Sequence, residues 1–498
     1  MGQVIEREVV KLMGDDPPKA RLLYGQDVRK SLKLIEPHTV QMVATSPPYW
    51  GLRDYGGEPG VWGGNPDCDH EWGDVGPAHH HGQVEQTKWK SAEGAGKGGN
   101  AGSGQFCKHC GAWLGQLGLE PTPRLFTQHV VEIFEGIRRV LRKDGVVFLN
   151  LGDTYFGSST SSSKHKNFGK DMVAEGRWPK DKSVGGTNPN HKNIAWKNAR
   201  ENPAAYNNLK PKDLVGIPWR VALALQDAGW YLRNDIIWAK GNCMPESVRD
   251  RCTRSHEYIF LFAHPDCGGN YFFDPHAIRE PCSEESVKNL LGRTVLDNKT
   301  DHGGSRPDMG NKPRTAYVRP DHTRNKRTVW NVNPKGYPGA HFAVWPEALV
   351  EPLVKAGSSQ HGCCSKCRAP YKRQLEVTGK AKAQWGTRSQ EGLDARLATA
   401  SGGVKNGMGQ FVQIKQTAGW EPTCDCPDHE VIPCLVMDTF SGSATTGVVA
   451  WKHGRDYIGT DLQPDYLDLA VARLEGRKAP AKGPKKDNSP DLIGDLFG

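Results

Sequence analysis

The sequence predicts an α/β fold with an open sheet and large inserts. A helical pattern at 127–141 leads through a short turn into the apolar run 146–151, and this succession is typical of α/β units. Residues 431–461 form a strand, a glycine-containing turn, a helix and a second strand. Between such segments lie long glycine-rich stretches without hydrophobic periodicity, which indicate inserts.

The composition is that of a basic protein without a membrane-spanning segment. Among the 498 residues, Lys and Arg exceed Asp and Glu by nine, which suits a polyanionic partner. No apolar run approaches the length of a membrane span, and no signal peptide opens the chain. We therefore expect a cytoplasmic protein with no membrane partner. The thirteen cysteines then favour metal ligation over disulfides.

The first core segment ends in a rigid corner at residues 45–50. Residues 22–27 and 40–44 predict two strands with a short helix between them. The second strand leads into Thr-Ser-Pro-Pro-Tyr-Trp. Two prolines end the strand there and leave carbonyl groups that do not hydrogen-bond to a neighbouring strand. The Ser46 hydroxyl, these carbonyls and the Tyr49 ring suit a planar heterocycle with an exocyclic amine. A Pro-Pro turn with a packing tyrosine is the alternative.

Residues 57–118 form a predicted insert rich in glycine, histidine and lysine. It contains Cys68 and His70 in a C-x-H pattern and, further on, Cys107 and Cys110 in a C-x-x-C-G pattern. These four side chains make a complete tetrahedral ligand set for zinc. Unrelated surface thiols and histidines are the alternative.

The middle of the chain predicts the far side of the same sheet. It follows a basic, flexible insert at 157–210. Asp213 can cap a helix that includes residues 217–225. Apolar runs at 231–238 and 257–262 then predict two strands in a hairpin-like arrangement.

Two further inserts follow. Residues 276–329 are rich in Lys and Arg, which favours a nucleic-acid-facing segment over a solvated loop. Residues 360–430 open with a C-x-x-C knuckle and close with C-x-C. The predicted second zinc set is Cys364, Cys367, Cys424 and Cys426, with Cys363 as the alternative to Cys364. Both sets are complete without water, so we expect two structural Zn²⁺ ions.

The strand–turn–helix–strand unit at 431–461 predicts a nucleoside site. Its small turn residues at 438–447 let a ligand approach the backbone and the helix N-terminus. Asp461 follows the turn by about twenty residues, the spacing of a carboxylate that binds ribose hydroxyls. A full G-x-G-x-x-G and a Walker lysine are both missing, so a nucleoside without a diphosphate fits best. An ordinary βαβ unit with a tight turn is the alternative.

Residues 45–49 and 438–443 closely resemble the motifs of the amino-methylating DNA methyltransferases. That family methylates cytosine N4 or adenine N6 from S-adenosylmethionine (SAM), and the order of the motifs here resembles its beta group. Ala444 departs from the family's usual glycine but is still small. The resemblance implies a Rossmann-like SAM-dependent methyltransferase sheet with large inserts; its core segments would be 21–56, 119–156, 211–275 and 330–475, before a disordered tail at 476–498.

The resemblance also implies roles for individual residues. The catalytic corner would comprise Ser46, Pro47, Pro48 and Tyr49. The SAM site would comprise Asp27, Thr45, Phe342, Pro346, Asp438, Phe440, Ser441, Gly442, Ser443 and Asp461. The target base would have to be turned out of the duplex. Catalysis would then need in-line positioning and loss of the amine's conjugation, with no cysteine nucleophile.

In this family, serine at the first motif position usually accompanies cytosine N4, so the resemblance favours cytosine over adenine. It further implies that residues 276–329 recognise the target sequence and that the partner is double-stranded DNA. It also implies a restriction-modification setting, a bacterial, archaeal or phage gene and a possible homodimer. Two other classes stay open. An RNA or protein methyltransferase would usually place the Pro-Pro-Tyr corner after the SAM loop. A non-catalytic zinc-containing nucleic-acid-binding protein would leave residues 45–50 and 438–461 without a purpose.

Overall fold

The computed structural model describes residues 5–10, 18–52, 58–73, 104–156, 208–210, 212–243, 245–283, 323–335, 344–382 and 411–477. Most of the predicted insert at 157–210, of the predicted segment 276–329 and of the predicted tail lies outside these residues. The chain divides into two compact units. The first comprises Met1–Phe272, Thr328–Ser358 and Pro433–Gly498, and the second comprises Phe273–Arg327 and Ser359–Ile432.

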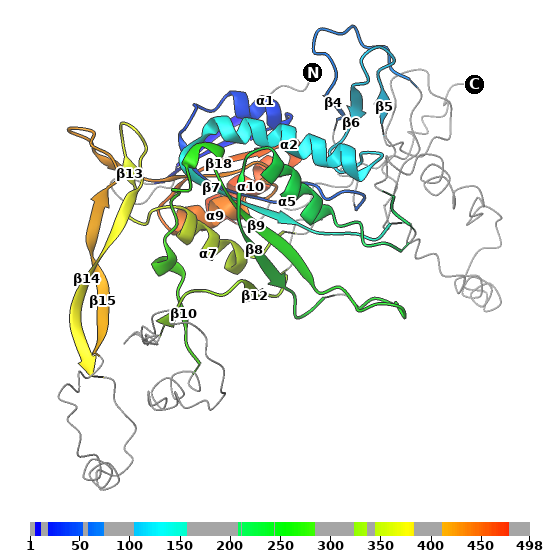
Figure 1. Ribbon diagram of the computed structural model, residues 1–498. Helices are drawn as coiled ribbons and strands as arrows, with labels where there is room; N and C mark the ends of the chain where they lie inside the picture. The colour runs from blue at the N-terminus through cyan, green and yellow to red at the C-terminus, as the bar shows by residue number, and fades with distance from the viewer. Residues whose placement is uncertain are drawn as a thin grey trace, which may run out of the picture. The chain divides into compact units, whose positions relative to one another are not determined.

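Nine of the described strands form one sheet in the first unit (Figure 1), in the order β1-β2-β18-β17-β3-β7-β9-β8-β12. Their bounds are β1 Ile5–Val10, β2 Lys19–Tyr24, β3 Val40–Thr45, β7 Leu141–Leu151, β8 Tyr231–Ala239, β9 His256–Ala263, β12 Val329–Asn331, β17 Leu435–Asp438 and β18 Asp456–Asp461. Neighbours from β2 to β7 pair in parallel, and so do β8 and β12. Strand β9 runs antiparallel between β7 and β8, and β1 is an antiparallel edge.

The central strands are apolar because both faces of the sheet are covered. All six residues of β3 are buried. Val43 pairs with Met437 of β17, and Ala44 pairs with Phe148 of β7. These parallel pairings bring the carboxyl ends of β2, β18, β17, β3 and β7 to one edge of the sheet. The amino end of β9 and the carboxyl end of β8 reach the same edge because β9 is antiparallel.

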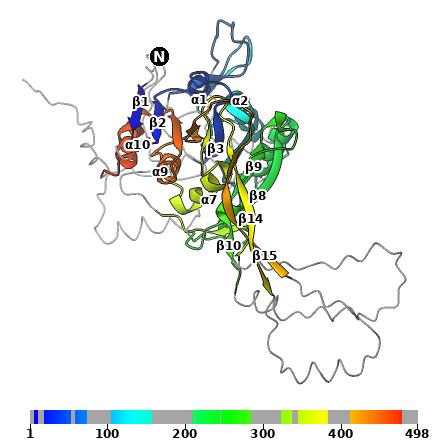
Figure 2. The same ribbon diagram turned by 90° about the vertical axis from the view of Figure 1, so that its left-hand side faces the viewer.

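Helices cover the sheet in two layers (Figures 1 and 2). One layer contains α1 Val28–Lys33, α2 Pro123–Val140 and α5 Ile217–Asp227, and α2 packs against both α1 and α5. The other contains α7 Glu347–Gly357, α9 Thr445–Lys452 and α10 Leu467–Leu474. Short 3₁₀ turns lie at η3 Pro265–Cys267 and η5 Pro464–Tyr466. None of the helices in the described ranges is long and apolar enough to cross a membrane.

The N-terminus of α5 differs from the prediction. Asp213 accepts a hydrogen bond from the Lys210 N–H at 2.7 Å instead of capping the helix. Asp153, which follows β7, accepts hydrogen bonds from the N–H groups of Gly216 at 2.9 Å and Ile217 at 3.0 Å. Local sequence favoured Asp213, but the tertiary fold brings Asp153 to the free N–H groups of the helix.

Smaller sheets complete both units. The first unit carries a three-stranded sheet, β4 Gly60–Trp62, β6 Trp113–Gly115 and β5 Gln105–Phe106. The second unit contains three two-stranded pairs and a 3₁₀ turn among its described residues. These are β10 Glu280–Pro281 with β11 Thr323–Arg324, β13 Cys363–Cys364 with β16 Val431–Ile432, β14 Tyr371–Lys382 with β15 Phe411–Pro422, and η4 Pro275–Ile278.

Candidate active site

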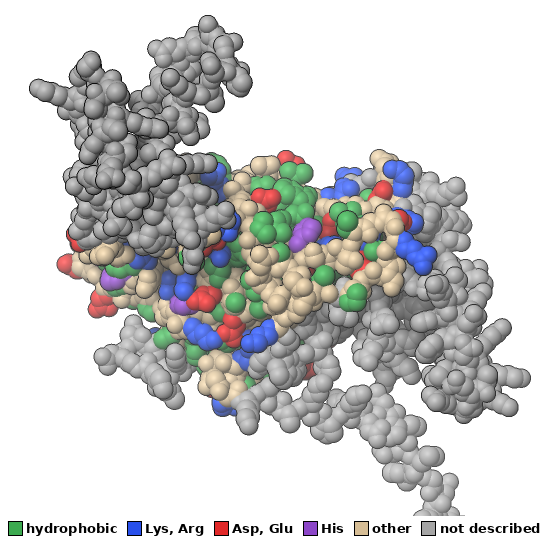
Figure 3. Space-filling model, turned by 90° about the horizontal axis from the view of Figure 1, so that it is seen from below, with side chains coloured by type: hydrophobic (Ala, Val, Ile, Leu, Met, Phe, Trp, Pro, Cys, Tyr) green, Lys and Arg blue, Asp and Glu red, His purple; other side chains and the backbone are tan. Residues whose placement is uncertain are grey.

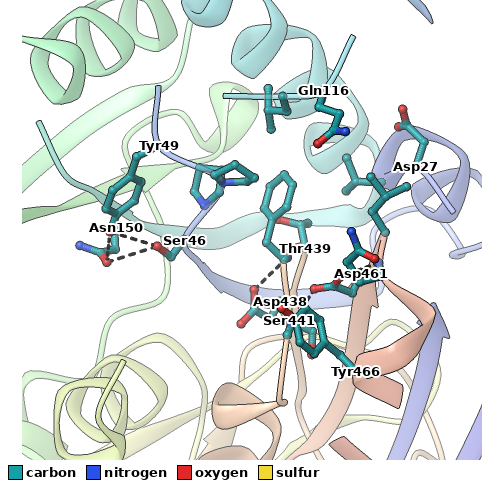
Figure 4. Close-up of a pocket in the computed structure, with 18 of the residues that line it drawn as sticks. Asp27, Ser46, Tyr49, Gln116, Asn150, Asp438, Thr439, Ser441, Asp461 and Tyr466 are labelled. Atoms are coloured by element: carbon teal, nitrogen blue, oxygen red, sulfur yellow. Dashed lines mark hydrogen bonds between the residues drawn. The ribbon is translucent and has the colours of Figure 1, made fainter. Parts of the chain in front are cut away.

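A cavity of about 1040 Å³ opens at the edge of the sheet where the parallel strands end (Figure 4). Ligands of open α/β sheets bind at this edge, and the volume suffices for a nucleoside cofactor and a second planar ligand. All described residues that line it belong to the first unit. The predicted site residues among them are Asp27, Ser46, Pro47, Pro48, Tyr49, Asp438, Phe440, Ser441, Gly442, Ser443 and Asp461.

Asp438 ends β17 and anchors the loop that follows it. Its buried carboxylate accepts hydrogen bonds from the Thr45 hydroxyl at 2.8 Å, the Thr446 hydroxyl at 2.7 Å and the Phe440 N–H at 3.1 Å. Burial disfavours the charged form and raises the pKa of Asp438 to about 6 despite these donors. Thr45 is buried and does not line the cavity. It therefore acts on the site by holding Asp438.

The loop from Ser441 to Ala444 exposes its backbone to the cavity. Gly442 has a φ of +49° and Ala444 a φ of +57°, a left-handed conformation that glycine adopts freely and alanine only with strain. The Ser441 hydroxyl lies 2.8 Å from the Tyr24 hydroxyl and 2.7 Å from the Tyr457 hydroxyl, both buried. The loop is thereby held from beneath while its open side faces the ligand.

Asp461 ends β18 beside this loop. Its two carboxylate oxygens accept hydrogen bonds from the Gly442 N–H at 2.7 Å and the Gln463 N–H at 2.9 Å. Each carboxylate oxygen has a further lone pair, so the group can also accept from the hydroxyls of a ribose. Burial raises the pKa of Asp461 to about 6.

Asp27 caps α1 and lines the far end of the cavity. Its carboxylate accepts from the guanidinium of Arg29 at 2.7 Å and 3.0 Å. Arg29 also pairs with Glu132 at 2.7 Å and lies over the Trp62 ring, 3.6 Å from its centroid. This arginine therefore fixes the orientation of Asp27 and joins it to strand β4.

The Ser46–Tyr49 corner occupies the other half of the cavity (Figure 4). The Ser46 hydroxyl lies 3.3 Å from Asn150 Oδ1, and the Tyr49 hydroxyl lies 2.8 Å from the same oxygen. Tyr49 also reaches Glu257 Oε2 at 2.9 Å. If the Ser46 hydroxyl donates to Asn150, its own lone pairs stay available to accept from an amine.

The sequence analysis missed three polar residues of this half, Asn150, Glu257 and Lys240. They come from the ends of β7 and β8 and the start of β9, and all line the cavity. Lys240 pairs with Glu257, and its ammonium lies 4.1 Å from the Trp238 ring centroid. One signal was present in the sequence: Asn150 interrupts the apolar run 146–151. Glu257 and Lys240 carry no comparable local signal.

Gly152 provides the space behind the Tyr49 ring. A Cβ atom added at Gly152 would lie 2.5 Å from Tyr49 Cε2, closer than real side chains approach. The ring therefore packs against the backbone of the segment that follows β7. Its position depends on the absence of a side chain there.

The remaining predicted cofactor residues lie on the segment before α7. Pro346 is the N-cap residue of α7 and does not line the cavity, whereas its neighbours Val344 and Trp345 do. Phe342 lies outside the described residues.

The two predicted metal sets are each brought together, one in each unit. Within each set, one potential ligand atom per residue lies within 4.8 Å of the others. In the first set, Cys68 Sγ is 3.9 Å from Cys107 Sγ, and Cys110 Sγ is 3.5 Å from His70 Nδ1. The second set comprises Cys364, Cys367, Cys424 and Cys426, and Cys363 is not among them.

Comparison with known proteins finds similarity over most of the chain. A family model described as DNA methylase matches residues 40–364 and 434–472. The chain is 32% identical to Type II methyltransferase M.SmaI of Serratia marcescens, over 91% of this chain and 90% of that protein. It is 28% identical to Type II methyltransferase M.Cfr9I of Citrobacter freundii, over 91% and 87%. It is 29% identical to Type II methyltransferase M.XycI of Xanthomonas campestris pv. cyanopsidis, over 92% and 88%.

Proposed function

Because the chain belongs to the amino-methylating DNA methyltransferases, we propose that it transfers a methyl group from SAM to cytosine N4 in double-stranded DNA. The observation that carries the proposal is one shared cavity: the Ser46–Tyr49 corner and the loop between Asp438 and Asp461 both open into it. A methyl donor held by the loop and an amine held by the corner would face each other there.

The described residues fit SAM on the loop side. Asp461 has lone pairs left for ribose hydroxyls, and the loop at 441–444 has no bulky side chain against which the nucleoside would collide. Asp27, whose carboxylate is fixed by Arg29, would lie at the end of the same site. When bound, SAM supplies a methyl group on a positively charged sulfur.

The corner would hold the target base. Ser46 Oγ and the Pro47 carbonyl can accept hydrogen bonds from an exocyclic amine, which withdraws the nitrogen lone pair from the ring. Turning the base out of the duplex costs a few kcal/mol. Stacking on the Tyr49 ring would offset about 1–3 kcal/mol of this cost.

Two features favour cytosine over adenine. In this family, serine at the first motif position, which is Ser46 here, usually accompanies cytosine N4. In addition, the two bases differ close to the amine. In both, a ring nitrogen lies beside the carbon that bears the amine, and the next ring carbon carries a carbonyl oxygen in cytosine but only a hydrogen in adenine. Lys240 lines the cavity, and its ammonium pairs with Glu257; its remaining N–H groups can donate to such a carbonyl. Adenine N6 is the second candidate, and it needs the same fold, cofactor and corner.

DNA would also contact the basic segment predicted for target recognition. In its described part, Glu280 accepts from Arg324 at 2.8 Å and from Arg327 at 2.7 Å, so these two arginines are partly neutralised. On the face drawn in Figure 3, the coloured Lys and Arg side chains are interspersed with acidic ones. The net charge of +9 is consistent with a polyanionic partner.

The test is product analysis. The protein is incubated with mixed-sequence duplex DNA and SAM, and the DNA is digested to nucleosides for mass spectrometry. N4-methylcytosine supports the proposal. N6-methyladenine overturns the choice of base and leaves the enzyme class. If neither product forms although SAM binds, the proposed DNA substrate is overturned.

A further inference from the structure

The first cysteine–histidine set lies in the small sheet that forms a wall of the cavity. Cys107 and Cys110 lie in the turn between β5 and β6, and Cys68 and His70 follow β4. All three residues of β4 line the cavity, and so do Gly115 at the end of β6 and the two residues that follow it.

Specific contacts connect this wall to the cofactor side of the cavity. Trp62 Nε1 donates to the Gly115 carbonyl at 3.0 Å, which joins β4 to the end of β6. The guanidinium of Arg29, which donates hydrogen bonds to Asp27, lies over the Trp62 ring. A Cβ atom at Gly60 would lie 2.9 Å from Asp27 Oδ2, so β4 packs directly against that carboxylate.

The wall is too small to be stable by its strands alone. Its three strands contain three, three and two residues, and such short pairings are marginal in water. Trp62 and Trp113 pack in the core of the first unit, and a structural metal ion can add stability to a small element of this kind. Three thiols and one imidazole are one of the donor sets that structural zinc sites use.

We propose that a Zn²⁺ ion bound by Cys68, His70, Cys107 and Cys110 orders the wall formed by β4 and β6, so that cofactor affinity depends on this metal. The inference rests on the proposed SAM site. A second Zn²⁺ ion at Cys364, Cys367, Cys424 and Cys426 belongs to the second unit, and no described residue of that unit lines the cavity. Loss of the second ion should therefore leave cofactor affinity unchanged.

The experiment compares Cys110→Ser with Cys367→Ser in the full-length chain. Metal content is measured by mass spectrometry and SAM affinity by calorimetry. We expect two zinc equivalents in the unmodified protein and one in each variant. If the wall is ordered in about a tenth of Cys110→Ser molecules, the apparent Kd for SAM rises about tenfold. The Kd of Cys367→Ser should stay within about twofold of the unmodified value.

Two controls keep the test independent of general misfolding. Cys252 is exposed and outside both sets, so Cys252→Ser controls for loss of a thiol. Cys110→His retains a zinc ligand and should restore both the metal and the affinity for SAM. Metal loss in Cys110→Ser with an unchanged Kd would overturn the inference, as would equal loss of affinity in both metal variants or an unmodified protein without zinc. An unmodified protein that holds two zinc ions but does not bind SAM would overturn the proposed function as well.

Discussion

Two substitutions of Tyr49 separate the contribution of its ring from that of its hydroxyl. Tyr49→Ala removes both groups, whereas Tyr49→Phe removes only the hydroxyl. The ring is proposed to stack on the flipped base. The hydroxyl lies 2.8 Å from Asn150 Oδ1 and 2.9 Å from Glu257 Oε2.

The two variants should differ in size of effect. Loss of base stacking costs about 1–3 kcal/mol, which corresponds to a fall of about 5- to 150-fold in kcat/KM for DNA. In Tyr49→Phe, Asn150 Oδ1 still has the Ser46 hydroxyl as a donor at 3.3 Å, and Glu257 still pairs with Lys240. Neither acceptor is left without a donor, so the cost should stay near 1 kcal/mol, or about fivefold.

The assay is methylation of limiting duplex DNA at saturating SAM, with SAM affinity measured separately. Both variants should bind SAM within about twofold of the unmodified protein, because Tyr49 lies on the base side of the cavity. A Tyr49→Phe defect as large as that of Tyr49→Ala would refute stacking as the main role of this residue. So would a Tyr49→Ala variant of unchanged kcat/KM.

Four further predictions address the same cavity. Asp461→Asn should raise the Kd for SAM by about tenfold or more, because hydrogen bonds to a charged acceptor contribute about 1.5–3 kcal/mol; calorimetry that finds an unchanged Kd would remove Asp461 from the cofactor site. The Kd for SAM should also rise as the pH falls through about 6, where Asp461 and the neighbouring Asp438 take up protons. Both pKa values lie above the ordinary value of 3.8, so the folded state binds more protons than the unfolded state. These two groups should therefore make the cofactor-free protein more stable to denaturant at pH 5 than at pH 7. Asp438→Asn should reduce this gain in stability. Gly152→Ala should displace the Tyr49 ring and lower kcat/KM for DNA with little change in SAM affinity, and equal activity would show that the ring has room to move.

Much of the cavity was predictable because its key residues belong to local motifs. Residues 45–50 and 438–447 each combine a buried strand with an abrupt turn, and both features depend on neighbours in sequence. The same holds for the metal sets, because the C-x-x-C pairs restrict the spacing of two ligands within one turn. The family of the chain follows from these short segments.

The other half of the base site was decided by tertiary structure. Asn150, Glu257 and Lys240 come from three strands, and they meet because β9 runs antiparallel between β7 and β8. Asp153 replaces Asp213 at the start of α5 for a similar reason, since it reaches the helix from the end of another strand. Strand order and direction depend on pairings between residues far apart in the chain, and no local pattern in the sequence encodes them. The sequence by itself therefore determined the chemical groups within each local motif, whereas only the fold determined which strand ends share one cavity.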